Sequence, residues 1–193
     1  MIESILKKAR ESALTQAQFF EAHAPRIAAC AEAMAGRVRE GARVFTMGNG
    51  GSACDAQHLA VEFAHPIIEK RRAFPAVCLS SDVPLLTAIG NDTDFARVFV
   101  DALELQARPV DIAIGVSTSG SAANVLRALK RARALGLLTI GFAGRDGGPL
   151  VDVCEYPFVV PSWSIHRIQE THTILLHVLW DQLHVALGED DVL

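Results

Sequence analysis

The stretch RVFTMGNGGS (residues 43–52) decides the fold. Its first five residues have the short apolar character of a buried strand, and the glycine-rich turn after them opens a helical segment that runs to about Ala64. The same order recurs in DIAIGVSTSGS (residues 111–121), which a second helical segment follows. A strand, a turn of small residues and a helix form the repeating unit of a parallel sheet.

Outward from these two units, apolar runs alternate with helical segments to the end of the chain. The predicted strands are residues 43–47, 75–80, 111–116, 137–142 and 156–160. The predicted helices after residue 64 are 83–89, 94–106, 122–135 and 165–187, with a short helical piece before the last strand. This alternation predicts an α/β fold of three layers, with helices on both faces of a five-stranded parallel sheet. Ligands bind such sheets at the carboxyl ends of the strands.

The first forty residues are predicted to be helical. Pro25 is expected to end a first helix, and a second is expected over residues 26–39. Both are apolar on more than one stripe, which favours contact with a neighbouring subunit, although a buried arm within one chain fits almost as well. We therefore expect one domain over residues 1–193, with oligomerisation helices in residues 1–40 and an α/β core in residues 41–193.

Composition narrows the class of protein. The 193 residues carry a net charge of −4, aromatic residues make up 6%, and no run of Lys and Arg exceeds three residues, which argues against a nucleic-acid partner. No apolar run reaches the roughly 18–20 residues that span a bilayer, and the N-terminus lacks the features of a signal peptide. The four cysteines are widely spaced and form no C-x-x-C motif, which favours reduced thiols. We expect a cytoplasmic protein without a membrane partner.

Two predicted loops have the chemistry of phosphate sites. GNGGS (residues 48–52) and STSGS (residues 117–121) each follow a strand and open a helix. Their small residues let backbone N–H groups approach an anion, and a helix N-terminus adds partial positive charge. Each loop alone could equally be a turn with helix-capping residues, but two on neighbouring strands favour a bound phosphate. Neither loop has the pattern of a nucleotide-binding loop.

Histidine and carboxylate side chains suggest a metal site. His58 and Glu62 stand at i and i+4, so they project from one helix face, as a simple ion pair also would. On the last helix, Gln169 and His177 are about 12 Å apart along the axis and about 80° around it. His172 is a rival ligand from spacing alone. Two imidazoles, a carboxylate and an amide carbonyl would suit Zn²⁺.

Several of these segments together resemble the sugar isomerase (SIS) domain family, and within it the phosphoheptose isomerases. The matching stretches, in chain order, are GNGGSACDAQHLAVEF (48–63), AIGND (88–92), STSG with AANV (117–125), GFAGRDGG (141–148) and RIQETHTILLH (167–177). The resemblance implies a flavodoxin-like SIS fold and a homotetramer with active sites lined by neighbouring subunits. It also implies the interconversion of sedoheptulose 7-phosphate and D-glycero-D-manno-heptose 7-phosphate.

The resemblance also implies roles for single residues. The metal set falls on His58, Glu62, Gln169 and His177, which selects His177 over His172 and would hold one Zn²⁺ per subunit. Glu62 and His177 match the acid/base pair, with Glu62 as the base at carbon and His177 helping ring opening or moving protons between oxygens. Substrate-binding positions are Asn49, Gly50, Gly51, Ser52, Glu62, Asn91, Asp92, Ser117, Thr118, Ser119 and Gln169.

Three departures from the family pattern leave the substrate open. Ala122 replaces a phosphate-contacting Ser, His166 replaces an Asp before RIQE, and Pro66 replaces an Arg after Glu62. The alternatives are a non-catalytic SIS protein that binds a partner protein, as replication-initiator-binding relatives do, and an isomerase or sensor for another phosphosugar. The first alternative predicts loss of the acid/base residues, whereas Glu62 and His177 are both present.

Overall fold

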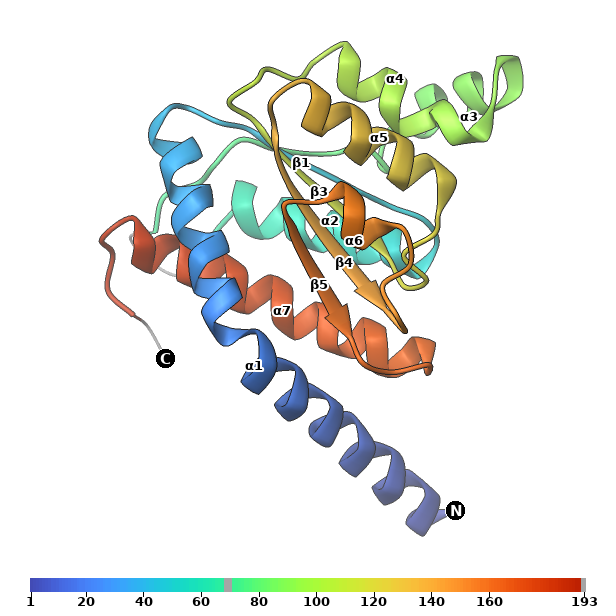
Figure 1. Ribbon diagram of the computed structural model, residues 1–193, viewed down its shortest axis with the longest axis vertical. Coiled ribbons are helices and arrows are strands. Elements are labelled where there is room, and N and C mark those ends of the chain that lie inside the picture. Colours follow the sequence, from blue (N-terminus) through green and yellow to red (C-terminus); the bar gives the residue numbers. More distant parts are fainter. Residues whose placement is uncertain (68–70, 192–193) are drawn as a thin grey trace.

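The computed structural model describes residues 1–67 and 71–191 (Figure 1). Its elements in chain order are α1 (Ile2–Arg39), β1 (Val44–Gly48), α2 (Gly51–Ala64), β2 (Ala76–Cys78), α3 (Val83–Asp92), the 3₁₀ helix η1 (Phe95–Arg97), α4 (Val98–Glu104), β3 (Ile112–Ser117), α5 (Ala123–Ala134), β4 (Leu138–Gly144), α6 (Leu150–Val153), β5 (Tyr156–Val160) and α7 (Ile165–Ala186).

The strands form one parallel sheet in the order β2-β1-β3-β4-β5. Val44 of β1 pairs with Ile112 of β3, which pairs in turn with Leu138 of β4. β1, β3 and β4 are buried along their whole length, as expected of strands covered on both faces. The predicted three-layer fold is confirmed. β2 lies on one side of β1, and β3 to β5 lie on the other side, so the order of the strands switches between β1 and β3. Such sheets bind ligands at this switch point.

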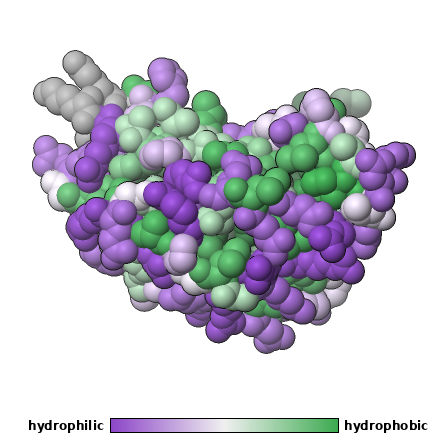
Figure 2. Space-filling view, turned by 90° about the horizontal axis from the view of Figure 1, so that it is seen from above, coloured by the Kyte–Doolittle hydropathy of each residue, from purple (hydrophilic) through white to green (hydrophobic). Residues whose placement is uncertain are grey.

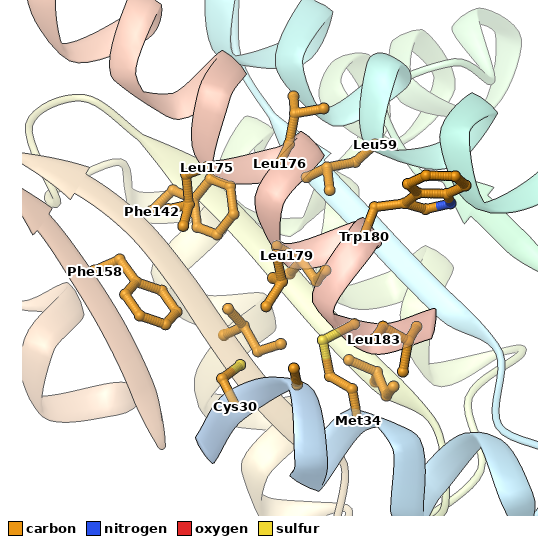
Figure 3. Packing of buried hydrophobic residues seen from close by; sticks show 14 of the residues in the cluster. Cys30, Met34, Leu59, Phe142, Phe158, Leu175, Leu176, Leu179, Trp180 and Leu183 are labelled. Atoms are coloured by element: carbon orange, nitrogen blue, oxygen red, sulfur yellow. The ribbon is translucent and has the colours of Figure 1, made fainter. Parts of the chain in front are cut away.

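Two hydrophobic cores lie on opposite faces of the sheet. α1, α2 and α7 cover one face, and their core includes Met34 of α1 and Leu179 of α7 packed with Phe142 of β4 (Figure 3). α3 to α6 cover the other face, where Phe45 of β1 packs in the same core as Leu129 of α5. The site-bearing helices α2 and α7 therefore share one face.

α1 is a single helix, so the predicted break at Pro25 is wrong. Proline removes one helical hydrogen bond and bends a helix rather than always ending it, and α1 changes direction partway along its length (Figure 1). Phe19 and Ile27 are buried on either side of the proline, and their packing holds both segments helical. Residues 1–10 are all exposed and extend beyond the domain. Neither α1 nor any other described helix has an apolar stretch long enough to cross a membrane.

The segment predicted as one helix over residues 94–106 is instead η1 followed by the short α4. The Asp94 carboxylate accepts a hydrogen bond from the backbone N–H of Ala96 over 2.9 Å. This local cap favours a tight first turn over a regular α-helical start.

Polar contacts fix the two helices that carry the candidate site. The Thr46 hydroxyl in β1 donates to the carbonyl of Ala56 in α2 over 2.7 Å. On α7, Glu170 accepts from the Ser12 hydroxyl of α1 over 2.6 Å, and Arg167 donates to the carbonyl of Lys8 over 2.6 Å. α2 is thus tied to the sheet, and the first half of α7 is tied to α1.

Candidate active site

The loop after β1 turns tightly into α2. Gly50 has a φ of +54°, a left-handed conformation that strains other residues. A Cβ on Gly51 would lie 2.0 Å from Nε2 of Gln169, so the missing side chain lets α7 approach the first turn of α2. The backbone N–H of the buried Ser52 donates to the carbonyl of Asn49 over 3.0 Å. The predicted residues of this loop form one compact turn, against which Gln169 lies.

His58 and Glu62 lie one turn apart on α2 and meet His177 of α7. The Nε2 of His58 is 3.2 Å from Oε1 of Glu62 and 3.2 Å from Nε2 of His177. The possible ligand atoms of all three residues lie within 4.8 Å of one another. Two imidazole nitrogens and a carboxylate oxygen therefore converge where α2 packs against α7.

The cluster is accessible and partly sheltered. The side chain of His58 is 37% exposed and that of Glu62 is 16% exposed. Burial lowers the pKa of His177 and the neighbouring His58 lowers it further, while Glu62 acts in the opposite direction. A neutral imidazole has a lone pair free to bind a metal or a proton. Two histidine nitrogens and one carboxylate oxygen match the donors that Zn²⁺ prefers.

His172 takes no part in this cluster. Its side chain is fully buried, and its Nε2 lies 3.0 Å from the carbonyl oxygen of Ala143 at the end of β4. Burial lowers the pKa of His172 to about 4, opposed by its hydrogen bond to Ala143. Of the two histidines that spacing leaves open, the structure brings His177 to His58 and Glu62, and places His172 in the core.

The loop after β3 presents hydroxyls beside the β1 loop. Ser117 is buried, and its Oγ lies 3.4 Å from the backbone nitrogen of Ala122, which donates to it. The Oγ atoms of Ser119 and Ser121 are 2.8 Å apart, and Thr118 is half-buried. α5 begins just after this loop without a side-chain cap because its N-cap residue is Ala122. The loop thus offers hydroxyls and a helix start at the switch point.

Asn91 and Asp92 pair with each other on α3. Both are exposed at the C-terminal end of α3, and the Nδ2 of Asn91 donates to Oδ1 of Asp92 over 2.7 Å. Their hydrogen bond joins these two side chains to each other.

The other two departures from the family pattern lie at helix ends. Pro66 is half-buried just beyond the last turn of α2, and His166 is exposed in the first turn of α7. Neither position belongs to the cluster of His58, Glu62 and His177.

Two buried polar residues beside the site are not evident from the sequence. Asp55 precedes His58 by one helical turn on α2 and is 8% exposed. Burial raises the pKa of Asp55 to about 6, and the neighbouring His58 acts in the opposite direction. Asn124, in the first turn of α5, is 3% exposed and hydrogen-bonded to Asn49. Both residues lie in stretches that resemble the family, and the i, i+3 spacing of Asp55 and His58 also points to Asp55, but the sequence alone assigns no role to either residue.

Comparisons with known proteins agree with this geometry. The family model described as "SIS domain" matches residues 9–144. The phosphoheptose isomerase of Aquifex aeolicus is 44% identical over 189 residues, which cover 98% of this chain and 99% of the relative. Solved phosphoheptose isomerases from Neisseria gonorrhoeae and Francisella tularensis are 33% and 30% identical, with TM-scores of 0.88 and 0.89. These alignments cover 95% and 94% of this chain, and 98% and 97% of the solved chains. The chain belongs to the SIS-domain family and, within it, to the phosphoheptose isomerases.

Proposed function

We propose that this protein is an aldose–ketose isomerase that interconverts sedoheptulose 7-phosphate and D-glycero-D-manno-heptose 7-phosphate. The observation that carries the proposal is the convergence of His58, Glu62 and His177 where α2, the helix that the β1 loop opens, packs against α7. The loop of the neighbouring strand β3 is rich in hydroxyls. The relatives named phosphoheptose isomerase support the same reaction.

The substrate would lie along the carboxyl edge of the sheet. Ser117, Thr118 and Ser119 would hold its phosphate through hydroxyl and backbone N–H groups, helped by the start of α5. The β1 loop and Gln169 would contact the reacting end of the sugar. In this proposal the loop contacts come from Asn49, Gly50, Gly51 and Ser52, and Asn91 and Asp92 would bind sugar hydroxyls.

Isomerisation moves the carbonyl from C2 to C1. Glu62 takes the proton from C1 while the former carbonyl oxygen on C2 gains a proton, and an enediol results. Return of a proton to C2 and loss of the proton from the oxygen on C1 gives the aldose. A positioned carboxylate is suited to the carbon-bound proton, and a neutral imidazole such as His177 is suited to moving protons between the two oxygens.

A metal would be held by His58, Glu62, Gln169 and His177. The two imidazoles and the carboxylate fit Zn²⁺, one ion per subunit, and the amide of Gln169 on α7 lies against Gly51 at the start of α2. When bound, such an ion would polarise a substrate oxygen and stabilise negative charge on it. Glu62 and His177 remain the groups that exchange protons with the sugar.

The proposed assembly is a homotetramer of single-domain subunits, with residues 1–40 as oligomerisation helices. Ile2, Ile5, Leu6 and Leu14 of α1 are about half exposed or more, which supports a subunit contact along this helix. Apolar residues also gather at the end of the molecule where α3 lies (Figure 2). The active sites would then be completed by neighbouring subunits. The four free cysteines support a cytoplasmic location.

The alternatives predict different binding. A non-catalytic partner-binding protein would have no need of Glu62 and His177 in contact with a second imidazole. The departures Ala122, Pro66 and His166 bear on which phosphosugar is converted rather than on the acid/base pair. An isomerase for another phosphosugar would keep the same cluster.

The test is incubation of the purified protein with sedoheptulose 7-phosphate, with aldose formation followed by chromatography. We expect conversion that falls when the metal is chelated and returns with added Zn²⁺. Binding of the phosphosugar without conversion would identify a sensor. Failure to bind it at all would favour the partner-binding protein, and conversion of a different ketose phosphate alone would correct the substrate.

A further inference from the structure

The two loops at the switch point are joined by a reciprocal pair of amide side chains. The Nδ2 of Asn49 donates to Oδ1 of Asn124 over 2.9 Å, and the Nδ2 of Asn124 donates to Oδ1 of Asn49 over 2.9 Å. Asn49 directly follows β1, and Asn124 lies in the first turn of α5, just beyond the β3 loop. The pair therefore connects the loop proposed to hold the sugar with the helix proposed to face the phosphate.

The orientation of the Asn124 amide is set by a third contact. Its Oδ1 also accepts the backbone N–H of Val125 over 2.9 Å. A backbone N–H can only donate, so the atom that faces it is the amide oxygen, and Nδ2 must face Asn49. Asn124 is also 3% exposed, so neighbouring atoms hold its side chain in place. It is the fixed member of the pair.

Asn49 is the half-buried member. An Asn side chain has one acceptor oxygen and two N–H donors. The pair uses the oxygen and one N–H of Asn49, so one N–H remains for another acceptor. Because Asn124 fixes the plane of this amide, it also fixes the direction of the remaining N–H.

We propose that Asn124 is a positioning residue that orients Asn49 toward the sugar and holds the sugar-binding loop at a set distance from the phosphate-binding helix. This role rests on the proposed function, since it requires that Asn49 touch the substrate. Asn124 acts through Asn49 and contacts no reacting atom.

A double-mutant cycle tests this role. Asn49→Ala, Asn124→Ala and the double variant are compared with the unaltered protein for kcat and KM on sedoheptulose 7-phosphate. We expect each single variant to lose about tenfold in kcat/KM, the loss that follows when a buried hydrogen-bonding group loses its partner. The double variant should be no worse than Asn49→Ala, because Asn124 has no route to the substrate except through Asn49.

Two further variants separate positioning from stability. Asn124→Asp has the same shape and keeps the acceptor for Val125, but it cannot donate to Asn49, so it should fold and still lose kcat/KM. Thr139→Val removes a buried hydroxyl near the start of β4 that accepts the backbone N–H of Glu155 over 3.1 Å. Because this end of the strand lies opposite the loops, the variant should lower the melting temperature without raising KM.

The outcomes are distinct. Unchanged kcat/KM in Asn124→Ala or Asn124→Asp, or fold-losses that multiply in the double variant, would overturn the positioning role while the proposed isomerase stands. A wild-type protein without turnover would overturn the proposed function and this role together.

Discussion

His172 and His177 lie five residues apart on α7 but occupy different environments. His177 meets His58 and Glu62 at an accessible cluster, whereas His172 is sealed between α7 and the end of β4 with the carbonyl of Ala143 as its partner. Five residues correspond to about 140° around a helix, which is enough to turn one imidazole toward α2 and the other toward the sheet.

The comparison shows that the two faces of α7 have different roles: one face carries groups of the candidate active site, and the other packs in the core. On the active-site face, Gln169 and His177 touch groups that could bind a ligand. On the core face, His172 is packed with Phe142 at a ring distance of 5.6 Å. Changes on the first face should cost turnover and leave folding intact, and changes on the second should cost stability.

The largest expected effect is on turnover in Glu62→Gln. The amide keeps the shape of the carboxylate but cannot take a proton from carbon, so kcat should fall by about 10⁴-fold. Thermal unfolding and oligomeric state should stay as in the unaltered protein. Near-normal kcat in this variant would remove Glu62 from the role of base.

His177→Ala tests the active-site face of α7. Loss of the imidazole removes a proton carrier and one metal donor, so we expect about 10³-fold lower kcat together with reduced zinc content by elemental analysis. His172→Leu is the matched variant on the core face, and its zinc content should not change. Equal loss of zinc in both variants would contradict the division between the two faces.

Most of the fold can be predicted from the sequence because local patterns of apolar and turn-forming residues mark the strands and helices. The strands that become β1 and β3 are buried on both sides, so their apolar runs are continuous and their glycine-rich or serine-rich turns mark where they end. The break predicted at Pro25 is wrong because it too rests on a local preference alone. The local preference of proline opposes a helix, and the packing of Phe19 and Ile27 in the core outweighs that preference.

The site is harder to predict because its members come from different elements. Spacing places Gln169, His172 and His177 on one helix but does not reveal which neighbour covers each side of it. The resemblance to a family selects His177, and the contact between α2 and α7 supplies the physical reason. Asn124 lies in the AANV stretch that resembles the family, but its partner Asn49 lies 75 residues away, so spacing does not reveal the pair.

Low pH should destabilise the folded protein through protonation of His172 in the core. The pKa of His172 in the folded protein is about 4, below the ordinary value of 6.5, so the unfolded chain binds a proton in this window and the folded chain does not. This contribution to stability is complete above about pH 6.5 and is lost as the pH falls towards 4, by about 3 kcal/mol. Urea unfolding between pH 7 and pH 4.5 measures it. His172→Leu should flatten this dependence and the exposed His166→Leu should not; equal slopes in all three proteins would refute the assignment.

The smallest expected effect concerns the contact between Gln169, on the active-site face of α7, and Gly51 in the first turn of α2. In Gly51→Ala the new methyl group meets the end of the Gln169 side chain, which is flexible and can move aside. Displacing this rotamer costs on the order of 1 kcal/mol, so KM should rise a few-fold while the melting temperature is kept. Gly36→Ala is the control, because a Cβ there meets nothing within 4 Å, and it should leave KM unchanged. A fall in melting temperature without a change in KM in Gly51→Ala would mean that Gln169 packs the helices together and takes no part in holding the sugar.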